Sequence, residues 1–309
     1  MVSQLARRLC LPFLALALTG CNTVLMHPSG DIAAQQANLI IVSTILMLVI
    51  IVPVILLTVF FAWRYRKNNT SATYLPDWDH STMLELIIWG GPLLIIIALG
   101  LITWISTHTL DPYRPLSRID ASHPIPAGTK TLTVEVVALD WKWLFIYPEL
   151  GIATVNELAA PVNVPIRFKI TASSVMNSFF IPALAGQIYA MPGMETSMHA
   201  VINQPGDFDG FSANYSGAGF SDMRFKFHGM SADDFGRWVQ RTKASTSVLK
   251  RADYVQLAQP TQRVPAKLYS EVDSDLFHAI VNRCVAPQSI CMDATMTADM
   301  HAAMHHTKP

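Results

Sequence analysis

Two long apolar runs dominate the first third of the chain. Residues 39–63 (LIIVSTILMLVIIVPVILLTVFFAW) carry no charged side chain, and residues 86–107 (LIIWGGPLLIIIALGLITWIST) form a second uncharged run. Each run is long enough to cross the hydrocarbon core of a bilayer as a helix, and a proline is tolerated inside such a helix. We therefore predict transmembrane helices at 38–63 and 85–107, joined by a loop at 64–84 into a hairpin.

The pattern changes after residue 108. Short β-branched and aromatic runs, such as TKTLTVEVVALDWKWLFIY and PVNVPIRFKITA, are separated by Pro, Gly and Asn. Such spacing predicts a β-sandwich or barrel over 108–230. From 231 the segment SADDFGRWVQRTK has a helical period, with Asp233 and Asp234 in its first turn, where negative charge suits the helix dipole. We predict a helical extension over 231–283.

The charge distribution sets the orientation of the hairpin. Apolar residues make up 51% of the chain and charged residues 14%, and the net charge is zero, so nothing predicts a nucleic acid partner. Arg64, Arg66 and Lys67 directly follow the first apolar run. The positive-inside rule therefore places the loop at 64–84 in the cytoplasm and everything after 108 on the outer, periplasmic side.

The N-terminus has the features of an exported protein. Arg7 and Arg8 precede a short apolar run that ends in LTGC, so residues 1–20 are predicted to be a signal peptide. LTGC resembles a bacterial lipobox, which implies lipidation of Cys21 and a lipidated periplasmic N-terminus over 21–37. The alternative is an ordinary signal peptide with an incidental Cys. Cys284 and Cys291 then remain, as a disulfide or as two free thiols on the oxidising side of the membrane.

Two stretches of the chain resemble subunit II of the haem-copper oxidases. HSTMLELIIWGGP is similar to the start of that family's second membrane helix, where a Glu marks the entrance of a proton channel into subunit I; Glu85 stands at this position. VALDWKWLFIYP is similar to the aromatic stretch near the point of electron entry, with Trp141 and Trp143 as candidates. The alternatives are an interfacial acid that faces water and two tryptophans in an interface with subunit I. The resemblance covers roughly residues 20–283 and implies a cupredoxin-like sandwich over 108–230.

The same resemblance predicts that the binuclear copper centre of that family is missing. In SSVMNSFFIPALAGQIYAMPG, Asn177 stands where the family has its first His ligand. In ANYSGAGFSDMRFKF, the positions of the family's Cys, Glu, Cys, His and Met are held by Tyr215, Gly217, Gly219, Met223 and Lys226. A binuclear copper centre needs bridging thiolates and imidazoles. We therefore expect no copper in this domain.

A copper-free domain of this kind is typical of the quinol-oxidising branch of the family. That resemblance implies ubiquinol as the reductant, haems and copper in subunit I, and no cofactor bound by this chain. The implied partners are subunits I, III and IV and membrane lipid in the bacterial inner membrane, without cytochrome c. Two alternatives are a cytochrome c oxidase subunit II with its ligands elsewhere, although 108–230 contains no Cys, and a lipid-anchored cupredoxin-like assembly or binding protein without a redox role.

The last segment, 284–309, is rich in Met and His. Four methionines lie four residues apart, with histidines among them: Met292, Met296, Met300, Met304, His301, His305 and His306. On a helix these soft ligands would gather on one side. The tail either binds a metal such as copper or has this spacing by accident in a low-complexity end.

Overall fold

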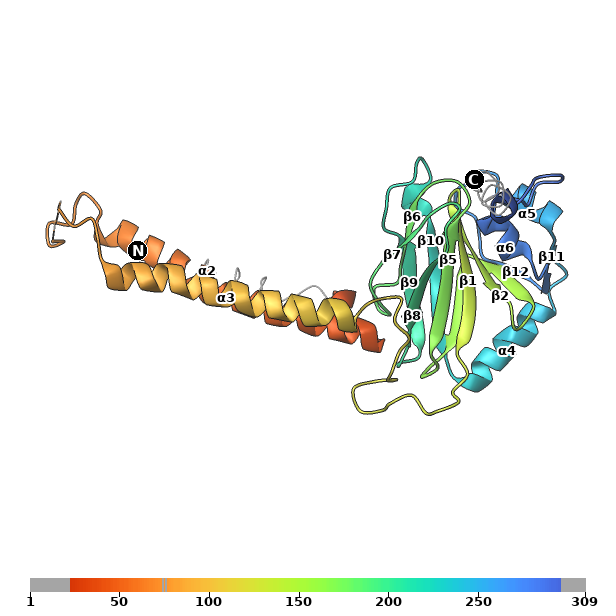
Figure 1. Cartoon of the computed structure of the whole chain (residues 1–309), viewed down its shortest axis with the longest axis horizontal. Helices are drawn as coiled ribbons and strands as arrows, with labels where there is room; N and C mark the ends of the chain where they lie inside the picture. Colours follow the sequence, from red (N-terminus) through yellow and green to blue (C-terminus); the bar gives the residue numbers. More distant parts are fainter. Residues whose placement is uncertain (1–22, 74, 76, 296–309) are drawn as a thin grey trace, which may run out of the picture.

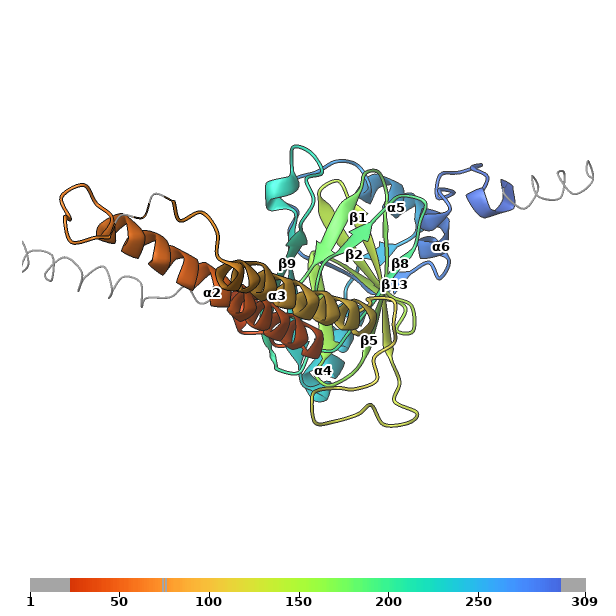
Figure 2. The same ribbon diagram turned by 60° about the vertical axis from the view of Figure 1, so that its left-hand side comes forward.

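The computed structural model describes residues 23–295 except 74 and 76. A helical hairpin projects from one side of a β-sandwich, next to β8 (Figure 1). The hairpin consists of α2 (Asp31–Arg64) and α3 (Thr82–Thr109), preceded by the short 3-10 helix η1 (Val24–Met26). Both long helices are long and apolar enough to cross a membrane, and they lie side by side in both views (Figures 1 and 2). The predicted hairpin followed by a β-sandwich is confirmed.

Helix α2 begins at Asp31, earlier than the apolar run from which the span 38–63 was predicted. Its first turns dock on the sandwich: Ala33 and Ala37 are buried, and the N–H groups of Ser29 and Gly30 both donate to the Ala183 carbonyl at 2.9 Å. A Cβ atom on Gly30 would lie 2.6 Å from the Leu184 carbonyl oxygen, so this close approach requires glycine. The described part of the segment predicted as a lipidated periplasmic N-terminus at 21–37 therefore includes the start of α2, which packs against the domain.

Two sheets form the sandwich. The strands of the first sheet, in spatial order, are β12 (Lys267–Tyr269), β3 (Ile152–Val155), β2 (Lys142–Tyr147), β1 (Leu132–Leu139), β5 (Ile166–Ala172) and β8 (Thr196–Ala200). Those of the second are β4 (Glu157–Pro161), β10 (Arg224–Met230), β9 (Gly206–Ser212), β6 (Asn177–Phe180) and β7 (Ile188–Ala190). Within these two sheets β1 pairs with β5 and β4 with β10 in parallel, and the other pairs are antiparallel.

The core between the sheets follows from the alternation along β1. Val134 and Val136 point inward, where they meet a cluster of aromatic rings, while Val137 and Leu139 point to the opposite face. The rings of the inner cluster are those of Trp143, Phe145, Tyr147, Phe168, Phe179, Phe225 and Phe227. A two-sided apolar pattern of this kind predicts that the outer face of the first sheet is covered as well.

The C-terminal extension provides that cover. Helix α4 (Ala232–Lys243) begins after Ser231, whose Oγ accepts a hydrogen bond from the Asp234 N–H at 3.1 Å. Helices α5 (Arg251–Leu257) and α6 (Leu276–Val281) and a short parallel pair, β11 (Val248–Leu249) with β13 (Glu271–Val272), follow. Leu249, Tyr254, Leu276, Phe277 and Ile280 pack on the outer face of β1, β2 and β3.

The predicted extension at 231–283 is not helical throughout, because it also contributes β12 to the first sheet. Lys267, Leu268 and Tyr269 pair antiparallel with β3. A disulfide joins Cys284 to Cys291, with 4.7 Å between their Cα atoms, in the segment that follows the extension. The predicted signal peptide, Cys21 and the tail methionines and histidines beyond 295 lie outside the described residues.

Candidate functional site

The positions that hold copper ligands in the resembling family meet at one end of the sandwich. The turn between β1 and β2 and the loop between β9 and β10 lie together there, and Trp141 joins them. Its indole Nε1 donates to the Ser216 carbonyl at 2.9 Å. A Cβ atom on Gly219 would lie 2.5 Å from Cδ2 of the Trp141 ring, and one on Gly217 would lie 3.0 Å from Cζ2. The indole therefore fills the space beside two glycines where that family has cysteine and glutamate.

The remaining positions of this set have separate surroundings. Asn177, at the start of β6, is buried, and its Oδ1 accepts from the Ser212 Oγ at 3.0 Å. The Met223 sulfur is buried and accepts from the Ser216 Oγ at 3.9 Å. Lys226 is exposed and its Nζ lies 2.6 Å from the Asp209 Oδ1, and Tyr215 is 75% exposed with its ring against Phe220.

The chemistry of these side chains does not suit a binuclear copper centre. They offer an amide, a phenol, a thioether and an ammonium group but no thiolate or imidazole. Among residues 23–295 without 74 and 76, no group of three or more His, Cys, Asp or Glu side chains is placed to hold a metal ion. What the arrangement does hold is an aromatic ring, fixed by a hydrogen bond between two loops.

Lys142 is a residue that sequence reasoning missed at this end of the sandwich. Its side chain is buried, and its Nζ donates to the carbonyls of Asp140 at 3.1 Å and Gln259 at 2.9 Å and to the Thr261 Oγ1 at 2.5 Å. Burial lowers the pKa of Lys142, and the nearby Asp140 opposes that shift. Lys142 therefore ties the extension at 259–261 to the turn that carries Trp141.

Three further contacts join the extension to the same end. The Thr261 N–H donates to the Asp140 carbonyl at 2.9 Å, and the Trp141 N–H donates to the Thr261 carbonyl at 3.3 Å. Arg263 forms an ion pair with Asp222 in the loop between β9 and β10, with 2.9 Å between Nε and Oδ2. The extension thus contacts both the turn that carries Trp141 and the loop that lies against its ring.

Trp143 differs from Trp141 in its surroundings. It is fully buried, with its ring 5.4 Å from that of Phe179 and 5.7 Å from that of Phe225 between centroids, and its Nε1 has no hydrogen-bond partner in the described part of the chain. Trp141 precedes β2 and is only partly buried. Of the two tryptophans, Trp141 is the one that reaches the surface.

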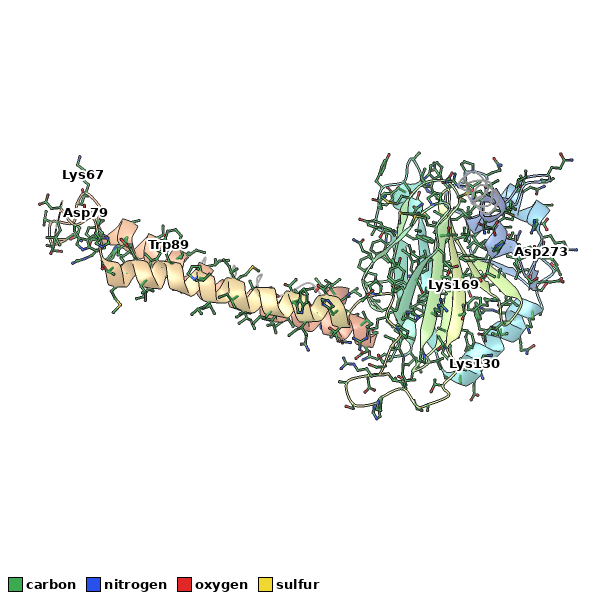
Figure 3. The ribbon with its side chains drawn as sticks, viewed as in Figure 1. Lys67, Asp79, Trp89, Lys130, Lys169 and Asp273 are labelled. Carbon is green, nitrogen blue, oxygen red and sulfur yellow. A yellow bond between two sulfur atoms is a disulfide. The ribbon has the colours of Figure 1, made fainter. Side chains whose placement is uncertain are left out.

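Glu85 lies far from this end, in the first turn of α3. Figure 3 labels Lys67, Asp79 and Trp89, which lie toward the end of the hairpin that is remote from the sandwich. The Glu85 Oε1 is 2.7 Å from the His80 Nδ1, and the side chains are 50% and 64% exposed. His80 is a second residue that sequence reasoning missed, although it begins the quoted motif HSTMLE. The pair forms a carboxylate–imidazole contact at the end of the hairpin predicted to face the cytoplasm.

Two family models match parts of the chain. The family model described as the cytochrome c oxidase subunit II periplasmic domain matches residues 147–229, and the one described as the COX aromatic rich motif matches residues 243–288. The second range covers much of the extension that contacts the loops around Trp141.

Two relatives are similar along most of their length. The cytochrome bo(3) ubiquinol oxidase subunit 2 of Pseudomonas putida is 53% identical over 274 residues, which cover 88% of this chain and 84% of the relative. The ubiquinol oxidase subunit 2 of Acetobacter aceti is 51% identical over 267 residues, covering 86% and 84%. Among solved structures, the periplasmic domain of subunit II of cytochrome oxidase from Bradyrhizobium japonicum is 25% identical, with a TM-score of 0.35, and the match covers 36% of this chain and 91% of that one.

Proposed function

The chain belongs to the ubiquinol oxidase subunit 2 family, with the cupredoxin-like periplasmic domain of cytochrome c oxidase subunit II, and from that membership we propose that it is the copper-free subunit II of a quinol-oxidising respiratory complex. This complex oxidises ubiquinol, reduces oxygen to water and moves protons across the bacterial inner membrane. Its haems and copper lie in subunit I, and subunits III and IV complete it. Cys21 carries the lipid anchor.

One observation carries the proposal. The side chains at the copper positions are Asn177, Tyr215, Gly217, Gly219, Met223 and Lys226, and the Trp141 ring lies against the two glycines. A soluble electron donor that needs a metal centre in this domain to pass on its electrons finds none at these positions. A membrane quinol needs none, because it reaches the haem-bearing subunit within the bilayer. The relatives named above are oxidase subunits, which argues against an assembly protein without a redox role.

The electron donor is tested by isolating the complex through a tag on this chain. We expect it to oxidise ubiquinol and to leave reduced cytochrome c unchanged, and its optical spectrum should show haem. Turnover with reduced cytochrome c as the sole donor would overturn the proposal. Isolation of the tagged chain without any haem-bearing subunit would overturn it as well.

We further propose that Glu85, paired with His80, admits protons to subunit I from the cytoplasmic side. A carboxylate 2.7 Å from an imidazole, with both groups open to water, can collect protons and pass them on. Glu85→Ala should slow proton uptake and turnover while leaving the haem content of the complex unchanged. Asp79→Asn, a substitution of an exposed acid in the loop that precedes α3, serves as the control. Equal turnover in the wild type and Glu85→Ala would refute the role of Glu85.

Trp141 is the candidate for contact with subunit I or with the electron-entry region, because it reaches the surface beside Ser216. Trp141→Phe keeps an aromatic ring but removes the hydrogen bond to the Ser216 carbonyl. Turnover that falls in Trp141→Ala and stays near wild type in Trp141→Phe, with haem content unchanged in both, would support a role for the ring. Full turnover in Trp141→Ala would end this part of the proposal.

A further inference from the structure

A cavity of about 250 Å³ lies where the hairpin meets the sandwich. Its walls are the first turns of α2, the end of α3, the linker at 110–118, the turn between β6 and β7, and β8. Backbone hydrogen bonds fix these walls: Ser29 and Gly30 donate to the Ala183 carbonyl, and the His199 N–H donates to the Pro112 carbonyl at 3.1 Å. The cavity is therefore part of the folded junction.

The depth of this cavity relative to a membrane follows from the apolar runs. The uncharged part of α2 begins near residue 38 and that of α3 ends near 107. At about 1.5 Å per helical residue, Asp31 lies about 10 Å beyond the start of the apolar part of α2. The headgroup layer on each side of a bilayer is about 5–8 Å thick. Asp31 thus lies just beyond that layer, whereas the lining residues Gln35 and Gln36 lie about 3–5 Å beyond the apolar part of α2, within the headgroups of the outer leaflet.

The charged groups that line the cavity are two arginines, Arg114 and Arg118, and two carboxylates, Asp31 and Asp111. The Arg118 Nε donates to the buried Asp31 carboxylate at 2.9 Å, and the Gln35 amide donates to the same oxygen at 2.8 Å. Arg114 is exposed, and its Nη1 makes a long contact of 3.4 Å with the His108 carbonyl. In the described part of the chain the terminal N–H groups of Arg118 have no hydrogen-bond partner. These donors remain available to an anion in the cavity.

The other lining groups suit the glycerol end of a lipid. The Gln36 side-chain amide lines the cavity next to Gly186. A Cβ atom on Gly186 would lie 2.7 Å from the Gln36 amide nitrogen, so the two residues are in close contact. Ile32, Leu110 and Leu116 supply apolar surface on the same walls. The cavity therefore combines two guanidinium and two carboxylate groups with amide and aliphatic groups at the depth of the bilayer surface.

We propose that this cavity binds the phosphodiester headgroup of an outer-leaflet phospholipid. The Arg114 and Arg118 guanidinium groups hold the phosphate oxygens, since a planar guanidinium matches phosphate geometry with two donors at once. The acyl chains then continue along α2 and α3 into the bilayer. The lipid would fix the angle at which the sandwich sits on the membrane, a role separate from the proposed electron and proton chemistry.

The purified complex in nanodiscs that contain a phospholipid with a photoreactive headgroup provides the test. After illumination, peptide mass spectrometry is expected to find labelled peptides from the linker at 110–118. Arg114→Gln should reduce that labelling about fivefold, the factor expected for one arginine at a charged lipid surface. Arg237→Gln, an exposed arginine of α4 paired with Asp234, is the matched control and should leave the labelling unchanged. Arg118 is left intact because its loss would strand the buried Asp31 carboxylate.

Two outcomes would overturn the proposal. The first is equal labelling of the linker in the wild type and Arg114→Gln. The second is complete loss of labelling in the wild type when excess inorganic phosphate is added, because that would identify a site for a free anion and not for a lipid. Labelling that resists inorganic phosphate but falls in Arg114→Gln supports the lipid assignment.

Discussion

Gly219→Ala tests the claim that the Trp141 ring occupies the space beside the former copper positions. The backbone of Gly219 has φ −95° and ψ 6°, which alanine also adopts, so the added methyl group acts through contact alone. That methyl carbon would lie 2.5 Å from Cδ2 and 2.6 Å from Cγ and Cε3 of Trp141. The ring is rigid and held by its hydrogen bond to Ser216, so it must move as a whole.

The expected loss of unfolding free energy in Gly219→Ala combines two effects. Overpacking a well-filled site costs about 1–3 kcal/mol, and the lost hydrogen bond from the Trp141 Nε1 contributes about 1 kcal/mol. Because Trp141 is partly exposed, its ring can swing toward water, which keeps the total near the lower end, about 2 kcal/mol. For a domain of this size that is a fall of about 4–8 °C in melting temperature.

Thermal unfolding of the full chain in detergent measures this cost in two backgrounds. In the wild type, Gly219→Ala should lower the melting temperature, and in Trp141→Ala the same substitution should cost almost nothing, because the clash is gone. Gly236→Ala in α4, where a Cβ atom meets nothing within 4 Å, is the control and should stabilise the helix by up to about 1 kcal/mol. An equal cost of Gly219→Ala in both backgrounds would refute the reasoning.

The remaining predictions concern the extension and the sheet. Lys142→Met removes three hydrogen bonds and leaves the Gln259 carbonyl without a donor, so we expect a loss of about 2 kcal/mol and faster limited proteolysis after residue 243. Burial raises the pKa of Glu135 to about 7 from an ordinary value of 4.5, so its contribution to stability is fully present below pH 4.5 and is lost as the pH rises through 7. Glu135→Gln should flatten that dependence by about 1 kcal/mol in urea titrations, allowing for solvent screening and for the opposing charge of Lys169. Replacing Cys284 and Cys291 by Ser should cost about 2.5 kcal/mol, and a thiol reductant should lower the melting temperature of the wild type but not of this variant.

The local pattern of side chains predicted the parts of the fold that depend on near neighbours. Uncharged runs predicted α2 and α3, short β-branched and aromatic runs predicted the sandwich, and a helical period with Asp233 and Asp234 in the first turn predicted α4. These features depend on local hydrophobic pattern and on charge at a helix end, which act within a few residues. They were therefore available before any tertiary contact was known.

The parts that were not predicted depend on partners distant in sequence. A lysine is rarely buried, and Lys142 is buried because the carbonyl of Gln259 and the hydroxyl of Thr261 reach it from the extension. The three residues of β12 have too little alternation to predict a strand, and they become one only by pairing with β3. Trp141 lies just before the start of β2 at Lys142, and Trp143 lies within β2. The two tryptophans therefore have different surroundings.

The pairing of β12 with β3 affects the order in which the chain can mature during export. Without β12, β3 would form an open edge of the first sheet, and open edges invite pairing with other chains. The strand that closes this edge is synthesised more than a hundred residues after β3, beyond α4 and α5. While the polypeptide is still crossing the membrane, the periplasmic domain therefore has an unprotected strand. A periplasmic chaperone would therefore protect the open edge of β3 during export, before β12 pairs with it, and not in the finished subunit.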